Sequence, residues 1–205
     1  MKTTTLRGFL LACAFLMANS GSAATISLQP ASQIGMPGDT VFLDLTVSGL
    51  GDGTAPSLGA FDIDLTFDDA ALDFIGGIFG DGLNDLLDPF TPLVQSLSAG
   101  IGTINLAEVS LLVTPLGDPT PLDLWQADAF VLATLEFLVV DLDPGTFTVV
   151  DFDDYLLGDG FGVELVDVGS EAATIFNPDT TVAEPMSILL LGVAMLGLVA
   201  ARRFS

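Results

Sequence analysis

The sequence predicts an all-β fold, an antiparallel β-sandwich or jelly roll of about nine short strands. Three observations predict it: apolar and polar residues alternate with a period of two, glycine and proline motifs separate the alternating stretches, and helical periodicity is nearly absent. Residues 25–181 form one domain, long enough to bury a core of its own. An N-terminal signal helix within residues 1–24 and a single C-terminal transmembrane helix within residues 182–205 are expected to flank it.

The clearest strand is the stretch 59–67, where four apolar residues alternate with Asp62, Asp64 and Thr66. The stretch 41–47 repeats this scheme, so both are expected to bury one face and expose the other. Further strands are expected, in chain order, at 26–28, 72–75, 103–111, 130–139, 146–152, 163–168 and 173–176. Turns are expected at 37–39, 49–56, 118–119, 143–145 and 158–160, and short helical turns at 82–88 and 122–126.

Charge is distributed very unevenly along the chain. The four basic residues are Lys2, Arg7, Arg202 and Arg203, whereas all 27 acidic residues lie between positions 25 and 185, a region that also lacks histidine. Binding to a phosphate backbone needs cationic side chains, so nucleic acid is excluded as a partner. Binding to an anionic membrane surface is excluded on the same ground. Cations, neutral or basic surfaces and uncharged sugars remain.

The N-terminus has the three parts of a secretory signal peptide. Lys2 and Arg7 provide the positive region, residues 9–18 the apolar region, and Ala23 or Ala24 the small residue after which cleavage is expected. The only cysteine of the chain lies inside this segment. The mature domain is therefore expected to contain no disulfide and no thiol chemistry.

The C-terminus combines a short polar motif, 182–185, with an apolar stretch, 186–201, and the basic pair Arg202 and Arg203. As a helix, the apolar stretch would rise about 24 Å, a little less than a bilayer core of about 30 Å. A buried core helix is the alternative, but such a helix usually has a polar face. Cations beside an apolar span stay on the cytoplasmic side, so the domain is expected outside.

These C-terminal residues resemble the PEP-CTERM sorting signal of Gram-negative bacteria. Glu184 and Pro185 match its Pro-Glu-Pro motif, while Ala183 replaces the first proline. The resemblance implies transient insertion into the inner membrane and processing near Glu184 and Pro185 by an exosortase-type protease. It also implies a bacterium that produces exopolysaccharide, and a final location at the cell surface, the outer membrane or the extracellular biofilm matrix.

The order of the strands resembles that of a cohesin-like domain. The stretch 38–50, the strand 58–68 and the motif 72–74 are similar to the start of that fold, and 130–137 with Pro144 and Gly145 is similar to its later strands. Asp68 and Asp69 stand where the family often has Asp-Pro, and 83–98 is expected to be an additional loop. Cohesins bind dockerin partners on a sheet face, and related sandwiches bind carbohydrate or are purely structural.

Composition leaves little room for catalysis. Without histidine, lysine, arginine or cysteine the domain has no serine triad, cysteine protease site, Schiff base or imidazole metal site. Paired carboxylates would suffice for a glycosidase, but no spacing singles out a pair among the glutamates. These are Glu108, Glu136, Glu164, Glu171 and Glu184. The single tryptophan and single tyrosine, Trp125 and Tyr155, offer little platform for a sugar. The chain is therefore expected not to be an enzyme.

No cofactor is required, but calcium remains open because it binds six to eight oxygen ligands. The densest acidic cluster is Asp151, Asp153, Asp154 and Asp159, and it does not fit an EF-hand loop. The alternative is that these carboxylates are solvated on an acidic surface.

Two functional hypotheses follow. One is a non-enzymatic binding or structural module of cohesin-like fold, whose partner is a surface protein or extracellular polysaccharide. The other is a carbohydrate-binding module or a carboxylate-based glycoside hydrolase.

Overall fold

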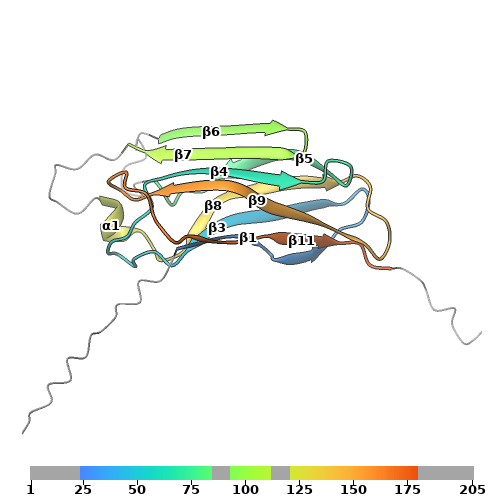
Figure 1. The fold of residues 1–205 in the computed structure, drawn as a ribbon, viewed down its shortest axis with the longest axis horizontal. Coiled ribbons are helices and arrows are strands. Elements are labelled where there is room, and N and C mark those ends of the chain that lie inside the picture. Colours follow the sequence, from blue (N-terminus) through green and yellow to red (C-terminus); the bar gives the residue numbers. More distant parts are fainter. Residues whose placement is uncertain (1–23, 85–92, 112–120, 180–205) are drawn as a thin grey trace, which may run out of the picture.

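The computed structural model describes residues 24–84, 93–111 and 121–179, which form a two-layer β-sandwich (Figure 1). One sheet has five strands in the order β10-β1-β3-β8-β5, and the other has six in the order β2-β11-β9-β4-β7-β6. The strands of the five-stranded sheet are β1 (Thr25–Gln29), β3 (Thr40–Ser48), β5 (Leu72–Phe79), β8 (Phe130–Val139) and β10 (Gly169–Glu171). Those of the six-stranded sheet are β2 (Ser32–Ile34), β4 (Ala60–Phe67), β6 (Leu93–Gly100), β7 (Thr103–Ser110), β9 (Phe147–Gly158) and β11 (Ala173–Phe176).

The core lies between the two sheets because each long strand buries alternate residues. In β4, Phe61, Ile63 and Leu65 are at most 2% exposed, and β3 repeats the pattern from Val41 to Val47. This is the alternation that the sequence predicts, so the all-β sandwich is confirmed.

Most neighbouring strands are antiparallel, but two pairs are not. β1 pairs with β10, and β2 with β11, in parallel. The wholly antiparallel sandwich predicted from the sequence is wrong at these two places. Both exceptions involve strands of three residues, which add one short strand to the side of each sheet.

The remaining differences concern short or weakly alternating segments. The described residues form eleven strands rather than about nine, because β2, β6 and β10 were not expected from the sequence. β6 lies inside the stretch 83–98 that was expected to be a loop. The strand expected at 163–168 is absent: Glu164 makes a single bridge to Gly158, and Val163 and Val166, which would lie on opposite faces of a strand, are both exposed.

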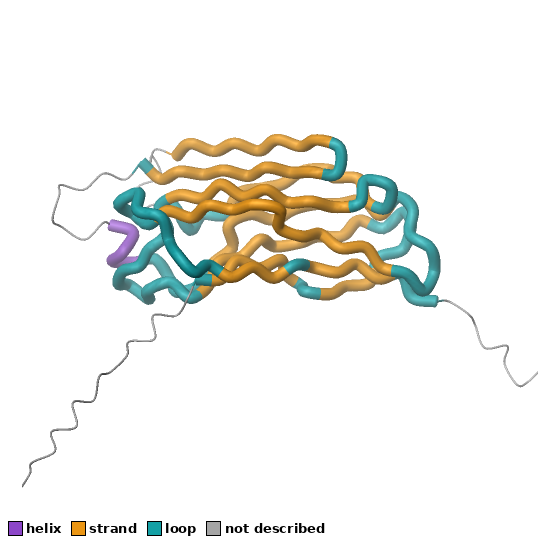
Figure 2. Tube along the Cα trace, in the orientation of Figure 1, coloured by secondary structure: helices purple, strands orange, loops and turns teal. Residues whose placement is uncertain are grey.

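A short helix, α1 (Pro121–Trp125), packs at one end of the sandwich (Figure 2), where a helical turn was expected. The buried amide of Gln126 holds this corner together. Its Oε1 accepts a hydrogen bond from the Leu58 amide at 2.5 Å, and its Nε2 donates to the carbonyls of Leu58 and Gly82, each at 3.0 Å. The Ser57 hydroxyl donates to the Asp123 carboxylate beside it. These polar groups are satisfied internally, so we assign them a structural role.

Of the signal segment predicted at 1–24, residues 1–23 lie outside the described residues, and so does the predicted membrane helix 186–201. Within the three described ranges, no helix has the length and apolarity needed to cross a bilayer. The two described ends of the chain leave from opposite ends of the sandwich (Figure 2).

Candidate functional site

The outer face of the six-stranded sheet carries an acidic band across its middle. Asp62 and Asp64 point outward from β4, since their neighbours Phe61, Ile63 and Leu65 are buried. Asp154 of β9 pairs directly with Asp64. On the other side of β4, the Asn105 Nδ2 donates to Asp62 Oδ1 at 2.7 Å and to Asp64 Oδ1 at 2.9 Å. One amide therefore holds two carboxylates in place and offsets part of their repulsion.

Apolar side chains lie on this face at both ends of the acidic band. At one end, Val94 of β6 pairs with Val109 of β7, and Leu156 of β9 pairs with Asp62 one row further along. At the other end, Phe176 of β11 pairs with both Ile34 of β2 and Phe147 of β9. All six apolar residues are exposed, and Phe147 most of all, at 63%. The face therefore has an acidic centre between two apolar groups, which we call the docking face.

The weak calcium candidates lie on or beside the same strand but do not converge. Asp151 and Asp154 are outward positions of β9, and Asp153 is the extra residue of a β-bulge. Asp159 lies beyond the strand, and its Oδ1 accepts hydrogen bonds from the amides of Phe161 and Val163, both at 2.8 Å. Among the described residues, no group of three or more acidic side chains is close enough to hold a metal ion.

One carboxyl group lies inside the sandwich. Glu108 of β7 points inward, is 1% exposed, and accepts a hydrogen bond from the Gln95 Nε2 of β6 at 2.8 Å. Its backbone neighbour across the sheet is Phe61, which also points inward. Burial raises the pKa of Glu108 above its ordinary value, and the hydrogen bond from Gln95 offsets part of that rise.

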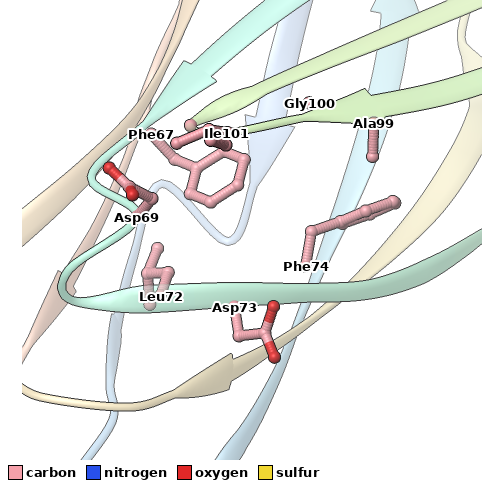
Figure 3. A pocket seen from close by; sticks show the side chains of 9 residues that line it. Phe67, Asp69, Leu72, Asp73, Phe74, Ala99, Gly100 and Ile101 are labelled. Atoms are coloured by element: carbon pink, nitrogen blue, oxygen red, sulfur yellow. The ribbon is translucent and has the colours of Figure 1, made fainter.

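A hollow of about 270 Å³ opens between the edges of the two sheets (Figure 3). Phe67 of β4 and Phe74 of β5 extend into it, and each ring packs edge-on against the buried Phe137, with centroids 5.4 Å apart. Ala99, which points inward from β6, is too small to cover these rings. Asp73 points to the other side of β5, but Asp69 also lines the hollow, so its lining combines the apolar rings with polar groups.

The candidate residues for sugar chemistry are separated. Glu108 is interior, whereas Glu136 lies on the outer face of the five-stranded sheet, between the buried Leu135 and Phe137. Tyr155 points inward, and its hydroxyl donates to the Val168 carbonyl at 3.0 Å. Glu108 and Glu136 therefore do not share a site, and the Tyr155 ring does not form a platform on the docking face.

The processing residues predicted from the sequence stay predictions. Ala23, Glu184, Pro185, Arg202 and Arg203 lie outside the described residues, and Ala24 is the first residue described, at the start of the sandwich. Sequence reasoning gave no hint of the buried Glu108, since it is one polar residue in an alternating stretch. The pairing of Glu108 with Gln95 can be recognised only once the position of β6 in the sheet is known.

The sandwich is similar to solved cohesin domains. The sixth cohesin from scaffoldin B of Acetivibrio cellulolyticus, solved in complex with the Cel5 dockerin, is 16% identical, with a TM-score of 0.55 over 76% of this chain and 99% of that one. CaCohA2 from Clostridium acetobutylicum is 16% identical, with a TM-score of 0.56 over 78% of this chain and 94% of that one. A non-cellulosomal cohesin from the archaeon Archaeoglobus fulgidus is 12% identical, with a TM-score of 0.50 over 74% of this chain and 88% of that one.

At these identities the similarity establishes the fold. The cohesin-like sandwich expected from the sequence is thus confirmed. No protein-family model matches the sequence, and no curated protein matches it.

Proposed function

We propose that this chain is a non-catalytic binding module that docks a protein partner on the outer face of its six-stranded sheet. The observation that carries the proposal is the docking face itself, with apolar groups at both ends and Asp62, Asp64 and Asp154 between them. Exposed apolar side chains grouped on a flat surface are typical of protein interfaces. The cohesin-like fold supports the same conclusion, because several similar structures are cohesins in complex with dockerins.

The chemistry of the face defines the partner. The folded domain contains no lysine, arginine or histidine, so the basic side chains that complement the acidic band must come from the other protein. Apolar side chains of the partner would cover Val109 and Leu156 at one end and Phe147 at the other. The expected partner therefore has a basic centre flanked by apolar residues, and its association rate falls as salt increases.

The test is a matched pair of substitutions on the two sheets. Secreted proteins of the producing bacterium are captured on the immobilised chain, and the identified partner is then purified and titrated by calorimetry. Phe147→Asp on the docking face is expected to weaken binding at least tenfold, since it places a charge in an apolar contact. Phe42→Asp, on an exposed phenylalanine of the five-stranded sheet, is the control and leaves affinity unchanged. Equal losses in both variants would contradict the proposal.

A glycan array addresses the other class of ligand. Reproducible sugar binding that survives Phe147→Asp would replace the proposed module with a carbohydrate-binding one. No binding to the array, together with a partner sensitive to Phe147→Asp, supports a protein-binding module.

We further propose that the domain reaches its site of action through both terminal segments. The signal peptide would be removed after Ala23 or Ala24, and an exosortase-type protease would cleave near Glu184 and Pro185. Arg202 and Arg203 would hold the apolar span in the inner membrane until that cleavage. The mature domain would then stand at the cell surface or in the polysaccharide matrix.

Mass spectrometry of the surface fraction tests this route. The expected mature chain begins at Ala24 or Thr25 and ends near Glu184. A mature surface protein that still contains Arg203 would overturn the sorting proposal and leave the binding proposal intact.

A further inference from the structure

The strand β6 has properties that sheet edges in natural proteins usually avoid. It forms the outer edge of the six-stranded sheet, is eight residues long and contains no charged residue and no proline. It lies inside the longest uncharged stretch between positions 25 and 185, from Pro89 to Ala107. Long, flat, uncharged edges pair readily with other strands, and proteins usually shorten, charge or cover them.

The interior beside β6 is also incompletely covered. Leu93, Gln95, Leu97 and Ala99 point inward towards β5, yet Gln95 and Ala99 are exposed and the two leucines are only partly buried. The hollow in Figure 3 lies at this same side, and the partly buried Phe74 of β5 faces it. Another strand added beside β6 would satisfy its outward backbone groups and cover these inward side chains together.

We propose that the strand beside β6 is β6 of a second copy, so that two chains associate edge to edge in an antiparallel, two-fold symmetric dimer. The distribution of charge favours a second copy of this chain as the partner of β6. Since the folded domain has no basic residue, two copies can share a surface without strong repulsion only where that surface is uncharged. β6 supplies such an edge, and an isologous contact requires only that one patch match itself.

The neighbouring edge strand fits the same arrangement. β5 is the edge of the five-stranded sheet on this side, and among its eight residues only Asp73 is charged. It exposes Ile75 and Ile78, the latter at 77%. In the dimer the two β5 strands come alongside each other beneath the paired β6 strands. The hollows beside Phe74 are then covered from both copies.

The first test measures the oligomeric state of the full chain in one detergent by analytical ultracentrifugation. The wild type is expected to be a dimer whose affinity increases with salt, because screening reduces the repulsion between two acidic chains. Ser96→Asp on β6 places like charges across the two-fold axis and is expected to weaken the dimer at least tenfold. Ser32→Asp on the opposite edge strand, β2, is the matched control and leaves the dimer unchanged. A monomeric wild type, or equal dimerisation of all three chains, overturns the proposal.

The second test separates edge pairing from association through the apolar C-terminal stretch. In a Cys13→Ser background, single cysteines replace Val94, Ser96 and Ser98, which all point outward from β6. Residues opposite each other in antiparallel strands have Cα atoms about 4.5–5.5 Å apart, within the range of a disulfide. Mild oxidation is expected to link at least one of these variants into a covalent dimer, and Ser32→Cys on β2 into none. Failure of all three, or equal linkage of Ser32→Cys, contradicts pairing through β6.

Discussion

The edge strands on the two lateral sides of the sandwich differ in length and in how they pair. On one side the sheets end in β2 and β10, strands of three residues that pair in parallel with their neighbours. On the other side they end in β5 and β6, strands of eight residues each. Figure 1 shows β6 at the upper edge of the molecule, parallel to its long axis. We call these the short-strand side and the long-strand side.

Side-chain packing in the interior can be compared on the same two sides. On the short-strand side, a Cβ added at Gly35, next to β2, would lie 2.8 Å from Ile175 Cγ2 and 3.0 Å from Val139 Cγ2. On the long-strand side, the inward glycine of β5 is Gly77, where an added Cβ would lie 3.1 Å from Leu135 Cδ2 and 3.5 Å from Leu97 Cδ2. Gly76 pairs with the outward Glu136, and a Cβ added there would meet nothing within 4 Å because it faces away from the core. Both inward positions are therefore in contact, and Gly35 is the tighter of the two. The uncovered surface of the long-strand side is limited to the hollow beside Phe74 and to the edge of β6, where a partner can bind.

The largest expected effect comes from testing this packing directly. Gly35→Ala should lower the free energy of unfolding by about 1–3 kcal/mol, because Ile175, Val139 and Val41 must move to admit the methyl group. Gly76→Ala should change it by less than about 1 kcal/mol, with a stabilising sign, since alanine has fewer unfolded conformations to lose. Denaturant unfolding of both variants measures the difference. Equal values would show that the interior around Gly35 admits a methyl group as readily as the outward-facing position of Gly76 does.

A second effect is expected from enlarging one alanine beside the hollow and another in the closed core. Ala99→Leu adds apolar groups to the hollow beside Phe74 and should stabilise the fold by about 1 kcal/mol. Ala133→Leu, at a fully buried position of β8, should destabilise it by about 1–3 kcal/mol. Unfolding midpoints that move in opposite directions support the comparison. A destabilising Ala99→Leu would mean that the hollow cannot accept a side chain.

The sequence predicts the tightly packed part of the molecule much better than the long-strand edge. β3 and β4 bury alternate residues, and β8 does so from Ala133 onward, because one face of each packs against the opposite sheet; the bounds of all three are close to those expected. β6 reads Leu-Val-Gln-Ser-Leu-Ser-Ala-Gly, in which small and polar residues occupy both faces. An edge strand that is only partly covered has no strict pattern to display. The opposite error occurs at 163–168, which contains three valines and was expected to be a strand but does not form one.

The acidic character of the candidate site was predictable from the sequence, but the positions of its residues relative to one another were not. The abundance of acidic residues and the absence of bases were evident, and so was the exclusion of nucleic acid. The pairing of Phe147, Phe176 and Ile34 depends on β2 and on the parallel pair that it forms, neither of which leaves a periodic pattern in three residues. The interior position of Glu108 likewise depends on which face of β7 meets the core.

Glu108 provides a pH-dependent test on the long-strand side, since its partner Gln95 belongs to β6. Its pKa in the folded state is raised by burial, so the folded domain is stabilised relative to the unfolded one when this group is protonated. That contribution is complete below the ordinary value of 4.5 and is lost as the pH rises through the raised pKa. Glu108→Gln should therefore raise the melting temperature at pH 7 by a few degrees, on the order of 2–4 °C.

The gain should disappear near pH 4, where the wild-type carboxyl is also neutral. Thermal scans of the wild type and of Glu108→Gln between pH 4 and pH 7 separate the effect of Glu108 from that of the other acidic groups, which both proteins contain. A variant that is less stable than the wild type at pH 7 would show that Glu108 is charged and well solvated in the fold.

The smallest effect is expected on the docking face, where neighbouring strands differ in charge. Asn105 of β7 bridges Asp62 and Asp64, whereas its partner Ser98 on β6 points outward from the same face without an acidic neighbour on its own strand. Asn105→Ala removes two hydrogen bonds to carboxylates and should cost about 1 kcal/mol at low salt, because the repulsion between the two acids is no longer offset. Ser98→Ala should cost less and respond little to salt.

Raising the salt concentration from about 0.01 M to 1 M shortens the Debye length from about 30 Å to about 3 Å, and should recover part of the Asn105→Ala loss. Melting temperatures of the two variants at both salt concentrations are the measurement. If Asn105→Ala and Ser98→Ala respond equally to salt, the repulsion in the acidic band is not local to Asp62 and Asp64. The contrast between an acidic docking face and an uncharged β6 edge would then be one of composition alone, with no local energetic consequence for the fold.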